Sequence, residues 1–134
     1  MDVKQKVRCL KQLRYLRGEV DQLSQRIARL EQAARDGAGS RARLEAMRGR
    51  LARRREECME QLGALYAFID DIDDSLMRQI MTYRYIDGDT WQMIAARIGE
   101  WDEQYPRRLH NRYLAGHALP ACVEFDENDE ADAL

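Results

Sequence analysis

The sequence predicts an all-α protein: a long antiparallel helical hairpin (coiled coil) followed by a compact helix-turn-helix module. Three observations predict this fold class. Proline and glycine together make up only ten of the 134 residues, while Arg, Leu, Ala and Glu, which favour helix, are abundant. Apolar residues recur at heptad spacing through two long proline-free segments. Glycine-containing turns then separate three short amphipathic segments. We therefore expect a hairpin over residues 1–72, the module over 73–116, and an acidic, disordered tail over 117–134.

The first predicted helix runs from Val3 to Arg35. Its aliphatic residues alternate in steps of three and four, which places them in one narrow stripe on one helix face. The stripe consists of Leu13, Leu16, Val20, Leu23, Ile27 and Leu30. Cys9 extends it towards the N-terminus and is interpreted as a small core residue. The segment 36–40 ends this helix, and Ser40 is a suitable N-cap for the next one.

The second predicted helix runs from Arg41 to about residue 72. Every seventh residue is apolar: Leu44, Leu51, Cys58, Leu65 and Ile72. Leu62 and Ile69 fill the alternate positions late in this helix, but Arg48 and Arg55 occupy them earlier, so that half of the seam is expected to be more hydrated. The short connection favours an antiparallel pair. Since two helices bury little surface, we expect the stripe to pack also against a second copy of the chain or against the C-terminal module.

Three short helices are predicted in the module. The acidic run 70–74 is interpreted as a junction, because acids suit the first turn of a new helix. The third helix has Leu76, Ile80 and Tyr83 on its apolar face and ends at Asp87-Gly88. The fourth begins after Asp89 or Thr90 as N-cap, has one apolar side and ends at Gly99; that side holds Trp91, Ile94, Ala95 and Ile98. The fifth covers residues 107–115, starts at about Pro106, and has Leu109 and Tyr113 facing inward.

The spacing of helix, turn, helix, turn and basic helix in 76–115 is that of a helix-turn-helix. Gly99 permits the sharp turn, and a small residue, Ala95 or Ala96, allows the last helix to cross closely. The run from Tyr83 to Gly99, YRYIDGDTWQMIAARIG, resembles the signature LRYI-x-G-x-[ST]-W-x-x-IA-x-x-[LI]-G of phage and prophage proteins related to region four of sigma-70 factors. These include ArpU-type late-gene regulators and uncharacterised relatives that pair an N-terminal coiled coil with such a module.

The resemblance implies a DNA-binding transcription regulator of phage or prophage origin, whose last helix reads the major groove. On that helix, Arg107, Arg108, Asn111 and Arg112 are predicted to project outward as the DNA-binding residues. Arginine can contact guanine edges or phosphates, and asparagine can pair with adenine. However, three acids precede these residues, and segment 99–115 is neutral overall, which weakens its attraction for phosphate.

Charge and composition limit the other function classes. Residues 1–57 hold sixteen of the 22 basic side chains, whereas residues 117–134 hold six acids and no base. The sequence has neither a run of apolar residues long enough to span a membrane nor a signal peptide, and its three cysteines are expected to be reduced thiols; a cytoplasmic location without membrane association is therefore expected. His110, His117 and Cys122 lack the spacing of a zinc site. We found no pattern for a catalytic site, metal or cofactor, so a non-enzyme is expected.

The predicted partners are double-stranded DNA, RNA polymerase as a possible contact of the hairpin, and a second copy of the chain in a homodimer. Two alternatives stay open. The protein is either a protein-interaction module that no longer binds DNA, or a small terminase-like subunit of a DNA-packaging machine.

Overall fold

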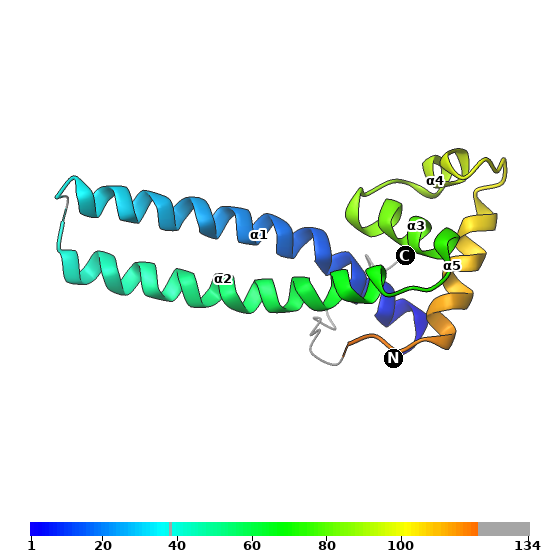
Figure 1. Ribbon diagram of the computed structural model, residues 1–134, viewed down its shortest axis with the longest axis horizontal. Coiled ribbons are helices and arrows are strands. Elements are labelled where there is room, and N and C mark those ends of the chain that lie inside the picture. Colours follow the sequence, from blue (N-terminus) through cyan, green and yellow to red (C-terminus); the bar gives the residue numbers. More distant parts are fainter. Residues whose placement is uncertain (38, 121–134) are drawn as a thin grey trace. The chain divides into compact units, whose positions relative to one another are not determined.

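A computed structural model of the protein describes residues 1–37 and 39–120, and every regular element within them is helical, which confirms the predicted all-α class (Figure 1). The elements are α1 (Val3–Arg35), α2 (Arg41–Asp70), α3 (Ser75–Met81), the π-helix η1 (Thr82–Ile86), α4 (Trp91–Arg97) and α5 (Gln104–Gly116). None of the helices in this described part is both long and apolar enough to cross a membrane.

The chain divides into two compact units, which we describe separately. Unit 1 combines Met1–Arg14 with the chain from Gly63 onward, and unit 2 is Tyr15–Leu62. This division differs from the one predicted at residue 72. The reason is that the first turns of α1 and the last turns of α2 pack with the C-terminal helices, so each long helix contributes to both units.

Unit 2 consists of the paired parts of α1 and α2, which run antiparallel (Figure 1). Two side-chain contacts join the helices: Arg55 Nη1 donates to Ser24 Oγ at 3.4 Å, and Cys58 Sγ donates to Glu19 Oε1 at 3.2 Å. The buried residues of this unit come mainly from α1. They are Leu16, Leu23 and Ile27, joined by Cys58 from α2.

The N-terminal half of α2 is covered less well. Leu44, Arg48, Leu51 and Arg55, which lie along the predicted seam, are all only half-buried. A seam that alternates leucine with arginine cannot exclude water, because the guanidinium groups must stay solvated. The expected weakness of this half of the seam is therefore present in the structure.

Side-chain caps begin α2, α3 and α4, two of them at residues that the sequence predicts as N-caps, Ser40 and Thr90, the latter predicted as an alternative to Asp89. Asp74, from the acidic run, caps α3 by accepting a hydrogen bond from the Met77 amide at 3.0 Å. Thr90 caps α4 by accepting one from the Met93 amide at 3.2 Å. Ser40 Oγ likewise lies 3.4 Å from the Arg43 amide at the start of α2. These caps satisfy amides that have no partner inside the helix.

The apolar face of α3 differs from the predicted one. Ile80 is fully buried, but Leu76 and Tyr83 are only half-buried, while Met81 and Tyr85 lie in the core. The difference arises because α3 continues as the π-helix η1, in which the amide of residue 87 bonds to the carbonyl of Thr82, five residues earlier. A π-turn contains more residues than an α-helical turn, so Tyr83 and Tyr85, which follow α3, do not keep the regular α-helical spacing that the prediction assumed.

Candidate nucleic-acid interface

The connection between α4 and α5 is a tight turn at Gly99. This glycine has a φ of +80°, a conformation that side chains other than glycine rarely adopt. The amide of Gly99 donates to the Ala96 carbonyl at 3.2 Å, and the amide of Glu100 donates to the Ala95 carbonyl at 2.8 Å. Of the two alanines weighed as the small packing residue, Ala95 is buried and Ala96 is exposed. Ala95 is therefore the residue that allows α4 and α5 to approach each other.

The buried face of α5 lies one residue further along than predicted. Pro106, His110 and Leu114 are buried, whereas Leu109 and Tyr113, which were expected to face inward, are half-buried. These three buried residues are each four positions apart, starting from Pro106 in the first turn of α5, so they lie on one face of the helix. Leucine and tyrosine are the more apolar choice, but the core of unit 1 selects His110, because the buried hydroxyl of Tyr85 needs a hydrogen-bond partner.

His110 joins three elements of unit 1. Its Nε2 lies 2.6 Å from the Tyr85 hydroxyl of η1, and its Nδ1 lies 2.9 Å from Oδ1 of Asn111. The ring of Trp91, at the start of α4, meets the imidazole edge-on with centroids 4.8 Å apart. Burial lowers the pKa of His110 to about 4. A neutral ring with its proton on Nδ1 satisfies both bonds: Nδ1 donates to Asn111, and Nε2 accepts from Tyr85.

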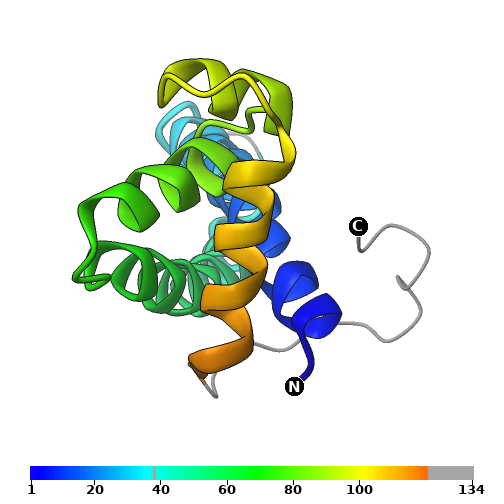
Figure 2. The same cartoon turned by 90° about the vertical axis from the view of Figure 1, so that its right-hand side faces the viewer.

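The exposed face of α5 carries most of the predicted DNA-binding residues. Arg108, Asn111 and Arg112 are exposed, while Arg107 is half-buried at the edge of this face. The three exposed positions lie three and four residues apart, so they form a stripe opposite the buried one. Figure 2 shows α5 crossing the front of unit 1, with no other helix of the unit over its outward side.

Two of these four side chains also have partners within the chain. Arg108 Nη1 lies 3.8 Å from a carboxylate oxygen of Asp102, an exposed pair that contributes little to stability. The amide oxygen of Asn111 bonds to His110, which leaves its NH₂ group to meet an outside acceptor. Of the three acids that precede α5, Asp102 therefore lies close to its basic face.

Arg84 is a basic residue beside this face that sequence reasoning missed. It comes from η1, its guanidinium lies over the Trp91 ring at 4.7 Å from the centroid, and it donates to the Asp89 carbonyl at 3.1 Å. Its pKa is lowered chiefly by burial, with the positive charge of Arg107 adding to the effect. Arg84 and Arg107 thus place two positive charges at one edge of α5. No local pattern indicates this contact, because the chain between η1 and α4 is not helical and the spacing of Arg84 and Trp91 does not place them on one helix face.

The C-terminal end of α5 is held by α1. Lys6 Nζ donates to the carbonyl of Leu114 at 2.5 Å and to that of His117 at 2.8 Å. A cation at this end also interacts favourably with the helix dipole. Leu119, which was placed in the predicted disordered tail, is buried in unit 1 and so belongs to the fold. Residues 121–134 of that predicted tail lie outside the described part of the chain.

The two cysteines in the described part of the chain are buried thiols. Burial raises the pKa of the Cys9 and Cys58 thiols to about 11, so both are protonated at neutral pH. Within residues 1–37 and 39–120, no three histidine, cysteine or acidic side chains come close enough together to hold a metal ion. Cys122, which the sequence analysis weighed with His110 and His117 and rejected as a zinc ligand, is outside these residues. Comparison of the chain with protein-family models, with curated proteins and with solved structures finds no match.

Proposed function

We propose that this protein is a DNA-binding transcription regulator in which α4 and α5 form a helix-turn-helix and α5 enters the major groove. The observation that carries the proposal is the outward stripe of Arg108, Asn111 and Arg112 on α5, next to the half-buried Arg107. Recognition helices need a row of side chains that can reach base edges and phosphates from one face.

The packing beneath α5 supports this role. A reading helix must keep its orientation when it meets the negatively charged duplex, and α5 is held on three sides. His110 bonds to Tyr85, Ala95 allows close contact with α4, and Lys6 caps the C-terminal end. The resemblance of residues 83–99 to region four of sigma factors points to the same function.

The roles we assign follow from exposure. Arg108, with Arg107 and Asn111, contacts base edges, and Arg112, further along α5, contacts phosphate. The antiparallel hairpin formed by α1 and α2 provides a surface for dimerisation or for contact with RNA polymerase. Each assignment makes a separate prediction, because base contacts carry specificity and phosphate contacts do not.

Selection of binding sites from random duplex DNA, at a stated salt concentration, tests the proposal. On the selected site, Arg107→Ala or Arg108→Ala is expected to cost about 1–3 kcal/mol, with little effect on random DNA. Arg112→Ala is expected to weaken binding to both kinds of DNA and to reduce the salt slope by about one phosphate contact. Asn111→Ala needs a parallel melting curve, because it also removes the bond to His110.

Arg53→Ala is the matched control, because Arg53 is an exposed arginine of α2 in unit 2. It removes the same charge without touching α5. If replacing Arg53, Arg54 and Arg55 abolishes DNA binding while changes on α5 do not, the helix-turn-helix does not recognise DNA.

The second candidate function is a protein-interaction module. The Asp102–Arg108 pair favours it, since an arginine already facing a carboxylate attracts phosphate less. Absence of salt-sensitive DNA binding would select this function. DNA binding by a ring of many copies would instead select the packaging subunit.

A further inference from the structure

Unit 2 contains an open groove of about 540 Å³ between α1 and α2. It is lined by Glu19, Leu23 and Arg26 from α1 and by Met47, Arg50, Leu51, Arg53, Arg54 and Glu57 from α2. The proposed function on α5, in unit 1, does not use this groove. We propose that a second copy of this chain binds there, with its own unit 2 turned antiparallel, so that the two units form a four-helix bundle. This inference specifies the dimerisation included in the proposed function.

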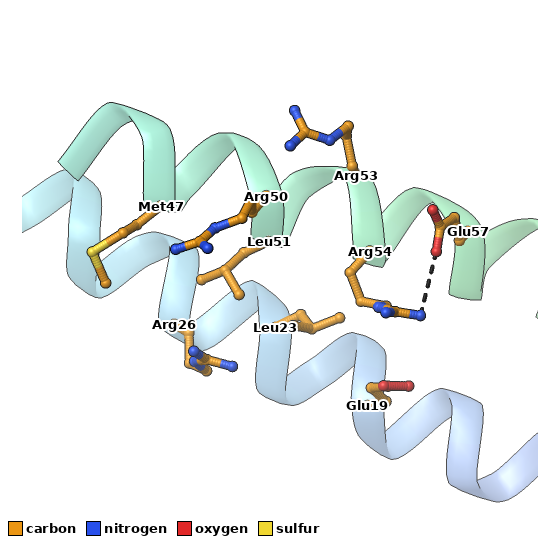
Figure 3. Close-up of a pocket in the computed structure, with 9 residues that line it drawn as sticks. All are labelled: Glu19, Leu23, Arg26, Met47, Arg50, Leu51, Arg53, Arg54 and Glu57. Carbon is orange, nitrogen blue, oxygen red and sulfur yellow. Dashed lines mark ion pairs between the residues drawn. The ribbon is translucent and has the colours of Figure 1, made fainter. Parts of the chain in front are cut away.

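The two ends of the groove carry opposite charges. Figure 3 shows Glu19 and Glu57 at one end and Arg26 and Arg50 at the other, with Leu23 and Leu51 between them. The charged ends are about 10 Å apart, because seven residues of helix separate Glu19 from Arg26. Arg54 also lies beside Glu57 in Figure 3, so the lining runs from a mixed but net acidic end, past the two leucines, to a basic end along the helix axes.

The charges of the whole unit follow the same direction. Residues 26–36 and 41–54 contain nine arginines and three acids, whereas residues 15–22 and 55–62 contain two arginines and five acids. The antiparallel pairing of α1 with α2 places the two basic stretches at one end and the two acidic stretches at the other. Unit 2 therefore has one basic end and one acidic end along the direction of its helices.

This separation of charge favours one symmetric arrangement of two copies of unit 2. Two copies can meet face to face about a two-fold axis that runs either along the helices or across them. The first choice places acid against acid and arginine against arginine. The second places Glu19 opposite Arg26 of the other copy and Glu57 opposite Arg50, and symmetry repeats each pair. Only the axis across the helices therefore brings opposite charges together.

The centre of the groove is apolar enough to be covered by a second copy. Leu23 lies near the proposed axis and is already buried, whereas Leu51 is only half-buried, as is Met47 at the basic end of the groove. A four-helix bundle covers such residues with the matching side chains of the facing pair. The backbone of Arg54 lies midway between Arg50 and Glu57 along α2, but its side chain reaches towards the acidic end of the groove in Figure 3. Its charge is countered within the chain by Glu57, 3.4 Å away.

A nucleic acid is a poorer match to this groove, although four arginines line it. Glu19 and Glu57 close one end and would repel phosphates, which are negative along the whole duplex.

The test is a charge exchange on α2, followed by sedimentation equilibrium of the full chain at low salt. Arg50→Glu alone and Glu57→Arg alone each place like charges opposite each other twice in the dimer. Each is expected to weaken dimerisation about tenfold or more. The double variant Arg50→Glu/Glu57→Arg is expected to restore it, since the facing charges are again opposite. The glutamate introduced by Arg50→Glu would also lie four residues before Arg54, which preserves an in-chain partner for that arginine.

Arg29→Glu is the matched control, because it reverses an exposed arginine of unit 2 that does not line the groove. It is expected to leave dimerisation within a few-fold of the parent value. Melting curves of all variants check that α1 and α2 still pair.

A monomeric parent chain would overturn the proposal, and so would dimers that the single reversals do not weaken or that the double variant does not restore. Loss of DNA binding in the groove variants, without a change in oligomeric state, would also overturn it and would assign the groove to nucleic acid. A monomer that still binds DNA through α5 refutes only this inference. A dimer that binds no DNA refutes only the proposed function.

Discussion

The buried imidazole of His110 predicts a specific dependence of stability on pH. His110 has an ordinary pKa of 6.5, and in the folded chain burial lowers it to about 4. Between these values the unfolded chain binds a proton that the folded chain does not. The free energy of unfolding therefore rises as pH increases from 4 to 6.5, and it is lost as pH falls through this range.

The size of the effect follows from the two pKa values. Each pH unit between 6.5 and about 4 contributes about 1.4 kcal/mol, so His110 accounts for a change of about 3 kcal/mol. This is a large part of the stability of a small domain, which is typically about 5–15 kcal/mol. Above pH 6.5 the contribution is complete, and below pH 4 both states carry the proton.

Urea unfolding of the parent protein and of His110→Gln between pH 4 and 6.5 isolates the contribution of His110 to the free energy of unfolding. Glutamine retains a donor and an acceptor for Asn111 and Tyr85 but does not titrate, and the carboxylates titrate in both proteins. We expect the parent to lose about 3 kcal/mol relative to the variant between pH 6.5 and 4. NMR titration of the imidazole, assigned with a His117→Ala variant, measures the pKa directly. A constant difference between the two proteins, or a folded-state midpoint near 6.5, would refute the reasoning.

Three further predictions concern other parts of the fold. Leu23→Ala removes a buried side chain of unit 2 and is expected to cost about 2–5 kcal/mol in urea unfolding; a variant that melts like the parent would contradict its burial. Thr90→Ala removes the cap of α4 and should cost about 1 kcal/mol, while Thr90→Ser should cost little. Truncation after Pro120 should leave the thermal transition unchanged, whereas truncation after His117 should lower it, because the second removes the buried Leu119. Equal transitions for the two truncations would show that Leu119 contributes nothing.

Local sequence patterns were sufficient to predict the helical architecture of the described chain. The observed α1 has the predicted limits, Val3 and Arg35, because heptad spacing and the glycines after it act within a few residues. The cap of α4 was narrowed to Asp89 or Thr90 for the same reason, since a cap bonds only to amides two or three residues away, and the structure has Thr90. The exposure of Arg108 and Arg112 also followed from local helical spacing.

The buried face of α5 and the division of the chain into units depend instead on long-range packing. His110 was dismissed as a weak metal ligand, yet its bond to Tyr85 orients α5. Lys6 reaches carbonyls more than a hundred residues further along the chain, and no local pattern indicates such a contact. The π-turn at 82–86 likewise breaks the α-helical period on which the prediction relied. Local propensity and caps depend on neighbours in sequence, whereas the partner of a buried polar group depends on which distant side chain the folded core brings within hydrogen-bonding distance.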